Sequence, residues 1–143
     1  MRISKRDRRT YKRLSVRLHG TAYYNNNSVE IRVDNISEEG IGFYFEIPKV
    51  DGDMDFEVGD FLTIQFIDEY MYGHEEYVSI ETVVGKVVQI RGPIDDEIYV
   101  GCSVRADFCD SAQEYREYYD YVSHRKSASF IKMVQGIRFN NGV

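Results

Sequence analysis

Two groups of polar residues near the start of the chain have the chemistry to recognise a purine and a phosphate. Arg9 and Arg13 lie four residues apart, and Arg8 directly precedes the first of them. A guanidinium can donate two parallel hydrogen bonds to a phosphate or to the N7 and O6 atoms of guanine, and it can stack on a purine ring. The three arginines therefore suit an anionic ligand that contains both groups.

The second group, residues 34–40, complements the arginines with hydrogen-bond acceptors. The carboxylate of Asp34 can accept hydrogen bonds from the N1 and N2 donors of guanine, and Ser37 can reach a phosphate or the purine. Gly40 allows an unusual backbone angle and a close approach of a ligand to the chain. Such a segment is by itself typical of an ordinary turn between strands, so its interpretation as a binding segment depends on the upstream arginines.

Charge is distributed unevenly along the chain. The net charge is -6, yet residues 2–17 carry eight lysines and arginines and one acid, so the remaining residues have a net charge of -13. A basic N-terminal arm beside an acidic body indicates an arm that meets an anionic ligand, folds back on the protein's own acids, or stays a solvated tail.

Alternation of apolar and polar residues predicts a mainly β fold. Residues 14–19 and 29–34 alternate in this way, with residues 25–28 as the turn of a hairpin. Further strands are expected at residues 40–47, 60–67, 77–91 and 97–107. Six short strands of this kind indicate a six-stranded antiparallel β-barrel, because closing the sheet removes its edges.

A change to helical periodicity predicts a C-terminal helix over residues 110–136. Asp110 suits the N-cap, and apolar residues then recur every three or four positions. The stripe consists of Tyr115, Tyr118, Tyr119, Val122, Phe130, Met133, Val134 and Ile137. An unbroken helix of this length would extend about 40 Å, more than a small barrel can cover. We therefore expect packing on the core, with contact to a partner or a second copy as the alternative for its far end.

Length and composition fit a single globular domain. The chain has 143 residues, of which 43% are hydrophobic and 29% charged. We predict one domain over residues 1–143, made of a flexible basic arm (1–12), a β-barrel (13–107) and a C-terminal helical segment (110–136).

The order and spacing of the two polar groups resemble the PilZ family, whose pattern is RxxxR followed after about one hairpin by D/NxSxxG. Weaker similarities extend from about residue 8 to about residue 121. They include a Gly-Asp pair within residues 58–62, a G-x-V strand at 85–88 and a closing strand at 99–102. Val104 departs from the pattern, because family members usually have a large aromatic residue there.

The resemblance implies a PilZ-like receptor for cyclic di-GMP in bacterial second-messenger signalling. The arm is highly charged and lacks apolar periodicity, so we expect ligand binding to order it and the altered surface to engage a downstream protein of unknown identity. The ligand-binding residues expected from it are Arg8, Arg9, Arg13, Asp34, Asn35, Ser37 and Gly40. Because Arg8 adds a third guanidinium, we expect two cyclic di-GMP molecules per chain at saturation, with one as the alternative.

The sequence offers little for catalysis, metal binding or membrane insertion. The histidines are isolated, and no phosphate-cradling glycine loop or nucleophile motif occurs, so we expect recognition without turnover, metal or cofactor. Cys102 and Cys109 match neither a disulfide framework nor a metal clip, which favours free thiols. The longest apolar run is far shorter than the ~20 residues that span a bilayer, and no signal peptide is recognisable. We expect a cytoplasmic protein.

Two other functions are compatible with the same residues. A small barrel could bind single-stranded nucleic acid through the basic arm and the nearby Tyr11, Tyr23 and Tyr24, but the acidic body counts against a long polyanion. A ligand-free PilZ-like module that binds only other proteins is the second alternative. The presence of the arginines and of Asp34 and Ser37 argues against it.

Overall fold

The computed structural model describes residues 12–68, 78–105 and 112–124. The strands are β1 (Leu14–Tyr24), β2 (Asn27–Ser37), β3 (Gly40–Glu46), β4 (Val50–Asp51), β5 (Phe61–Asp68), β6 (Val78–Ile94) and β7 (Glu97–Ser103). A single-turn 3-10 helix, η2 (Ile47–Lys49), joins β3 to β4. An α-helix covers residues 112–124 and is called the C-terminal helix below.

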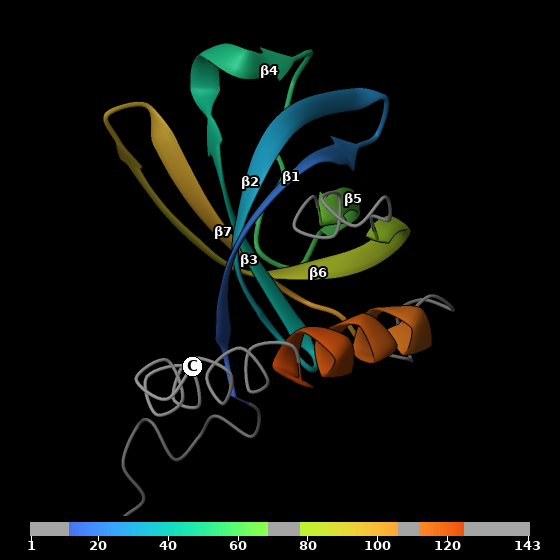
Figure 1. Cartoon of the computed structure of the whole chain (residues 1–143). Helices are drawn as coiled ribbons and strands as arrows, with labels where there is room; N and C mark the ends of the chain where they lie inside the picture. Colours follow the sequence, from blue (N-terminus) through green and yellow to red (C-terminus); the bar gives the residue numbers. More distant parts are fainter. Residues whose placement is uncertain (1–11, 69–77, 106–111, 125–143) are drawn as a thin grey trace, which may run out of the picture.

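Six of the strands close into a ring. Their order in the sheet is β1-β5-β6-β7-β3-β2, and β1 also pairs with β2, so the first and last members of the series meet. Every pairing is antiparallel, and the two-residue β4 attaches to β2 outside the ring (Figure 1). The predicted mainly β fold, with six antiparallel strands and a C-terminal helix, is confirmed.

Side chains that alternate along the strands fill the inside of the ring. Buried residues recur at every second position over most of β2, β3 and β5, as the period of two requires. The largest fully buried side chains of the ring are Phe43, Phe66, Ile36, Leu62, Ile64, Val29, Val33, Val83, Val87 and Val100. One continuous apolar core therefore supports the polar residues on the outer surface.

Two turns are tighter than predicted. The turn between β1 and β2 occupies only residues 25 and 26, and Asn25 has a φ of 56°, a left-handed conformation that asparagine tolerates better than most residues. Asp95 and Asp96, with φ values of 52° and 66°, join β6 to β7, as in the type I′ turns of two-residue hairpins. Both hairpins therefore extend beyond the predicted strand ends.

Strand β7 ends earlier than predicted, at Ser103 instead of residue 107. The next residue, Val104, donates its backbone N–H to the carbonyl oxygen of Glu39 at 2.9 Å. Glu39 belongs to the turn between β2 and β3 and directly precedes Gly40, the partner of Ser103, so this bond adds a last link between the end of β7 and that turn.

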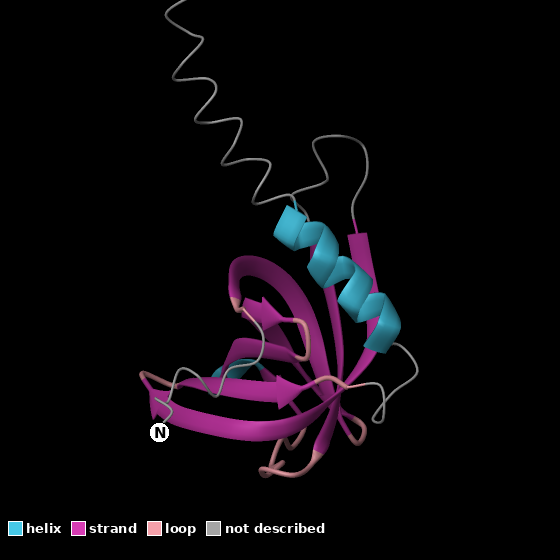
Figure 2. Ribbon diagram, turned by 90° about the horizontal axis from the view of Figure 1, so that it is seen from below, coloured by secondary structure: helices cyan, strands magenta, loops and turns pink. Residues whose placement is uncertain are grey.

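The C-terminal helix packs against one end of the ring (Figures 1 and 2). Its predicted apolar stripe is buried over the described residues, from Tyr115 to Val122. Tyr118 contacts the ring of Phe66 edge-on at 5.5 Å, and its hydroxyl donates to the buried carboxylate of Asp68 at 2.9 Å. Residues 110–111 and 125–136 of the predicted helix lie outside the described residues. In the part of the chain that the structure describes, no helix has the length and hydropathy needed to cross a membrane.

Candidate ligand-binding site

A bulge near the end of β2 turns two consecutive polar side chains outward. Val33 and Ile36 are both buried, so an extra residue must be accommodated between them. The register between β2 and β3 shifts at this point, and β1 has a matching irregularity opposite Asp34. Asp34 and Asn35 are only partly buried. The bulge therefore places a carboxylate and an amide side by side on the outer surface, where a regular strand would turn one of them inward.

Strand pairing brings Arg13 to the same end of the ring. Leu14 on β1 pairs with Ile36 on β2. Arg13 precedes the first of these and Ser37 follows the second, so they are the next residues along two antiparallel strands. Arg13 is exposed and Ser37 is partly buried. A guanidinium and a hydroxyl that are distant in sequence thus become neighbours.

Gly40 contributes to the site through its small size and not through an unusual backbone angle. Its φ lies outside the left-handed region, so the predicted need for conformational freedom is wrong. A Cβ atom at this position would lie 3.1 Å from the Oγ of Ser37 and 3.4 Å from the carbonyl oxygen of Cys102. The glycine thereby keeps space free beside the Ser37 hydroxyl.

Asn35 joins β2 to β7 across a glycine of β3. Its Nδ2 atom donates to the Oδ2 of Asp34 at 3.1 Å and to the hydroxyl of Tyr99 at 3.1 Å. A Cβ atom on Gly42 would come 2.1 Å from the Tyr99 hydroxyl and within 2.9 Å of both polar atoms of the Asn35 side chain. This contact between β2 and β7 therefore requires glycine at position 42.

Aromatic rings and arginines hold Tyr99 in place. The ring of Tyr44 meets that of Tyr99 edge-on at 5.0 Å, and the guanidinium carbon of Arg91 lies 4.4 Å from the centre of the Tyr99 ring. Arg32 sits over Tyr44 in the same way and forms an ion pair with Glu97 at 3.3 Å. Such contacts each add a modest stabilisation, and together they fix the Tyr99 ring on the outer surface.

The C-terminal helix holds the turn between β2 and β3. The fully buried Tyr115 donates its hydroxyl to the backbone carbonyl of Gly40. Burial raises the pKa of Tyr115 well above its ordinary value, so this hydroxyl remains a donor at neutral pH. Arg116 forms an ion pair with Glu39, with 2.7 Å between Nη2 and Oε1. The helix therefore contacts the same turn that carries Gly40.

The helix also contacts the chain directly before β1. The hydroxyl of Tyr119 donates to the backbone carbonyl of Lys12 at 2.8 Å, one residue before Arg13. Burial is also the main cause that raises the pKa of Tyr119. One helix thus links the two segments that carry the predicted binding residues.

Five of the seven predicted binding residues lie at this end of the ring: Arg13, Asp34, Asn35, Ser37 and Gly40. Arg8 and Arg9 lie outside the described residues. No pattern in the sequence indicates Tyr99 or Gly42 as part of the site, because their relation to Asn35 depends on the register of β2, β3 and β7.

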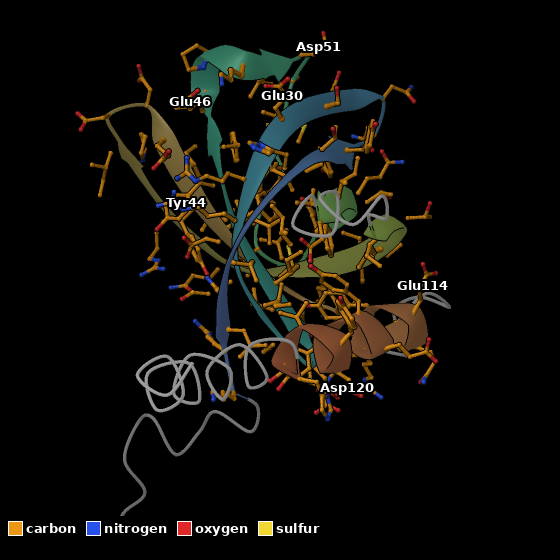
Figure 3. All side chains as sticks on the ribbon, viewed as in Figure 1. Glu30, Tyr44, Glu46, Asp51, Glu114 and Asp120 are labelled. Carbon is orange, nitrogen blue, oxygen red and sulfur yellow. The ribbon has the colours of Figure 1, made fainter. Side chains whose placement is uncertain are left out.

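Other features of the described surface do not form a comparable site. A groove of about 580 Å³ crosses β1, β2, β3 and β5 near Glu30 and Glu46 (Figure 3), where Lys49 lies 3.1 Å from Glu46 and 3.9 Å from Glu30. Its charged groups thus pair largely with one another. No cluster of metal-binding side chains occurs among the described residues. Cys102 is a free, buried thiol whose pKa is raised to about 12 by burial.

Comparison with known protein families identifies the domain. The model of the PilZ domain family matches residues 7–114, which include both polar motifs. The chain belongs to the PilZ family. Among curated proteins, none is similar enough in sequence to match it.

Three solved structures share this fold with the chain at low sequence identity. The inhibitor of motility MotI/DgrA from Bacillus subtilis has a TM-score of 0.58 and 17% identity, over 83% of this chain and 53% of that one. YcgR from Escherichia coli in complex with c-di-GMP has a TM-score of 0.56 and 12% identity, over 89% of this chain and 50% of that one. The PilZ domain of YcgR with c-di-GMP has a TM-score of 0.57 and 12% identity, over 87% of this chain and 98% of that one. The chain thus spans about half the length of the first two proteins and nearly all of the isolated PilZ domain.

The PilZ pattern also clarifies the roles of the two outward-facing residues of the bulge. In D/NxSxxG the first position lies two residues before the serine and five before the glycine. With Ser37 and Gly40 in those places, the first position is Asn35, and Asp34 is an additional carboxylate directly before the pattern. The hydrogen bond between them makes the two side chains one polar unit.

Proposed function

We propose that this PilZ domain is a receptor for cyclic di-GMP that binds the ligand without cleaving it. The observation that carries the proposal is the position of Arg13 beside Ser37, next to the outward-facing Asp34 and Asn35. Two solved structures with this fold, both of YcgR from Escherichia coli, are described as containing c-di-GMP. The ligand offers guanine edges and phosphates, and this end of the ring offers a guanidinium, a carboxylate, an amide and a hydroxyl.

Each residue has a distinct role in the proposed complex. Arg13 donates to a phosphate or to the N7 and O6 atoms of a guanine. Asp34 and Asn35 accept hydrogen bonds from the N1 and N2 donors on the opposite edge of a base. Ser37 donates to a phosphate oxygen, and Gly40 keeps the space beside that hydroxyl open.

Arg8 and Arg9 complete the site from the N-terminal arm. Binding folds this arm over the ligand, because the positively charged arm is attracted to the phosphates and its arginines can pair with them beside Arg13. The arm leads directly into Lys12, whose carbonyl accepts a hydrogen bond from the C-terminal helix. A change in the arm would therefore reach the helix, and the altered surface would engage a downstream protein.

The proposed stoichiometry is two molecules per chain. Two cyclic di-GMP molecules can interleave their guanines into one stack with twice the negative charge of a single molecule. Arg8, Arg9 and Arg13 supply three guanidiniums for such a stack. Replacement of Arg8 by leucine should lower the calorimetric stoichiometry toward one while binding persists. A stoichiometry near one for the unaltered protein would remove this part of the proposal and leave the receptor function standing.

Isothermal titration calorimetry tests the receptor function. The purified chain should bind cyclic di-GMP more tightly than cyclic di-AMP, GTP or GMP, and affinity should fall as salt is raised because exposed arginines contribute. Chromatography of the recovered ligand should show the intact cyclic dinucleotide. Absence of heat at high micromolar ligand would contradict the proposal, and a linear dinucleotide would mean that the protein is an enzyme.

A further inference from the structure

We propose that Tyr99 is a positioning residue that presents the carbonyl oxygen of Asn35 to the ligand and so favours guanine over adenine. The inference rests on the proposed function, since it concerns how that site would discriminate between bases. The inference adds to the site a residue of β7 that belongs to neither of the two sequence motifs.

The two hydrogen bonds of Asn35 define which end of its amide faces outward. A carboxylate can only accept, so the atom that faces Asp34 at 3.1 Å must be the NH2 group. The second hydrogen of the same group points to the hydroxyl of Tyr99, also at 3.1 Å. Both donors are therefore engaged within the protein, and Oδ1 is the atom left to meet a ligand.

The exposed oxygen suits guanine better than adenine. Guanine carries two adjacent hydrogen-bond donors, N1 and N2, which an amide oxygen can accept. Adenine has one donor on the same edge, its N6 amino group, beside an acceptor at N1 that an oxygen would repel. A rotation of the Asn35 amide by half a turn would place the NH2 group outward and remove this preference for guanine.

Tyr99 is the more rigid of the two partners of Asn35. Its side chain is 6% exposed, and it is fixed by the ring of Tyr44 and the guanidinium of Arg91. Asp34 is partly exposed and is itself a proposed ligand contact. Once Asp34 turns toward a base, the Tyr99 hydroxyl is the contact that holds the amide in place.

Gly42 supports the same arrangement from β3. A Cβ atom at this position would lie 2.1 Å from the Tyr99 hydroxyl, far inside contact distance. Its φ is not in the left-handed region, so alanine could adopt the backbone conformation. A methyl group there would crowd both the Tyr99 hydroxyl and the Asn35 amide and separate the two, without removing any polar group.

The test compares Tyr99→Phe with Tyr44→Phe. Each change removes one hydroxyl from neighbouring rings of the outer surface, and only the first removes a hydrogen bond to Asn35. Affinities for cyclic di-GMP and cyclic di-AMP are measured by calorimetry, and thermal unfolding checks the fold. Loss of one neutral hydrogen bond predicts that Tyr99→Phe weakens cyclic di-GMP binding about three- to tenfold. The ratio of the two affinities should fall by a similar factor, and Gly42→Ala should act in the same direction.

A second background separates positioning from a merely structural role. In an Asn35→Asp variant both side-chain oxygens accept, so there is no orientation for Tyr99 to maintain. Adding Tyr99→Phe to Asn35→Asp should then leave the guanine-to-adenine ratio within about twofold, whereas a structural role would lower it in either background.

Two results would overturn the inference. One is a Tyr99→Phe protein with the unaltered affinity ratio, and the other is an equal loss of that ratio whether or not the Asn35→Asp change is present. If the unaltered chain binds neither dinucleotide, the proposed function fails and this inference fails with it. Binding by the unaltered chain with no effect of Tyr99→Phe rejects the positioning role alone.

Discussion

The two ends of the strand ring are built differently. At one end, called here the motif end, the turn between β2 and β3 and the residues before β1 are held by tyrosine hydroxyls of the C-terminal helix and by the Asn35 network. At the other, called the hairpin end, which carries the β1–β2 turn, η2 and β4, Lys49 of η2 forms exposed ion pairs with Glu46 and Glu30. Polar groups at the motif end therefore depend on buried partners, and those at the hairpin end depend mainly on solvent.

This difference predicts that substitutions at the two ends will change the stability of the protein to different extents. A buried hydroxyl that loses its acceptor costs the protein the desolvation of the group left behind, whereas an exposed ion pair contributes little when broken. We therefore expect substitutions at the motif end to have large effects and matched substitutions at the hairpin end to have small ones.

The largest expected effect is that of Tyr115→Ala. The side chain is fully buried, and its loss leaves a cavity and an unpaired Gly40 carbonyl, so the free energy of unfolding should fall by about 3 to 5 kcal/mol. The matched control is Tyr23→Ala at the hairpin end, where the ring is 37% exposed and its hydroxyl bonds to Gln65. Urea unfolding followed by circular dichroism measures both. Equal destabilisation by the two changes would contradict the comparison.

The next effect concerns ligand affinity. Charged hydrogen bonds contribute about 1.5 to 3 kcal/mol, so Arg13→Ala and Asp34→Ala should each weaken cyclic di-GMP binding by roughly tenfold to a hundredfold. Lys49→Ala removes the same unit charge as Arg13→Ala but at the hairpin end, and it should change affinity less than about twofold. Calorimetry at one salt concentration compares the three variants. Full affinity in Arg13→Ala would show that any ligand binds elsewhere.

Alkaline pH should destabilise the motif end more than the hairpin end. Burial raises the pKa of the Cys102 thiol to about 12, so from about pH 9 upward the unfolded chain releases a proton that the native protein retains. The stabilisation that the protonated Cys102 thiol gives the native protein is fully present below pH 9 and is lost as pH rises through the native pKa. The free energy of unfolding should fall by up to about 1.4 kcal/mol per pH unit in this range. Cys102→Ala should flatten this dependence in urea titrations between pH 7 and 11.

The control for this titration is Tyr24→Phe near the hairpin end. Burial and the neighbouring Asp60 also raise the pKa of Tyr24, but its ring is partly exposed to solvent. Its removal should alter the slope less than Cys102→Ala does. Both changes are made in a Cys109→Ser background, so that Cys102 is the only thiol that titrates in the reference protein. An unchanged slope in Cys102→Ala would contradict the prediction.

The smallest effect distinguishes two ion pairs. Arg116 and Glu39 are 2.7 Å apart, with side chains 32% and 28% exposed, whereas Lys49 and Glu46 are 3.1 Å apart and 56% and 49% exposed. Double-mutant cycles should give a coupling of about 1 kcal/mol for the first pair and about 0.3 kcal/mol for the second. Half-molar sodium chloride should abolish only the weaker coupling. A larger coupling at the hairpin end would reverse the comparison.

Much of the fold could be predicted from the sequence because local patterns determine it. Alternation of apolar residues in segments such as 29–34 marks the strands, and the tyrosines after residue 112 mark the buried face of the helix. Strand ends were less predictable. Asn25 and the pair Asp95 and Asp96 adopt left-handed conformations that shorten their turns, and no periodicity signals this choice.

The candidate site was predictable only in part. Arg13, Asp34, Asn35 and Ser37 could be recognised by type and spacing. Alternation over residues 29–34 predicts a regular strand through Asp34, but Asp34 and Asn35 are two consecutive polar residues between the apolar Val33 and Ile36, as the bulge requires. The contact between Asn35 and Tyr99 joins residues 64 positions apart, and it depends on strand register, which composition does not encode.

The strand order also determines when the ring can close during protein synthesis. The β1–β2 hairpin and β3 are made first and can pair at once, and β5 can then pair with β1, but the gap between β5 and β3 is filled only by β6 and β7. Until residue 103 has been made, the growing chain is an open sheet with two exposed edges, a state prone to pairing with other chains. Such long-range closure is slow compared with hairpin formation. The segment that carries the arginines is therefore made well before β7, the last strand that supports its binding surface.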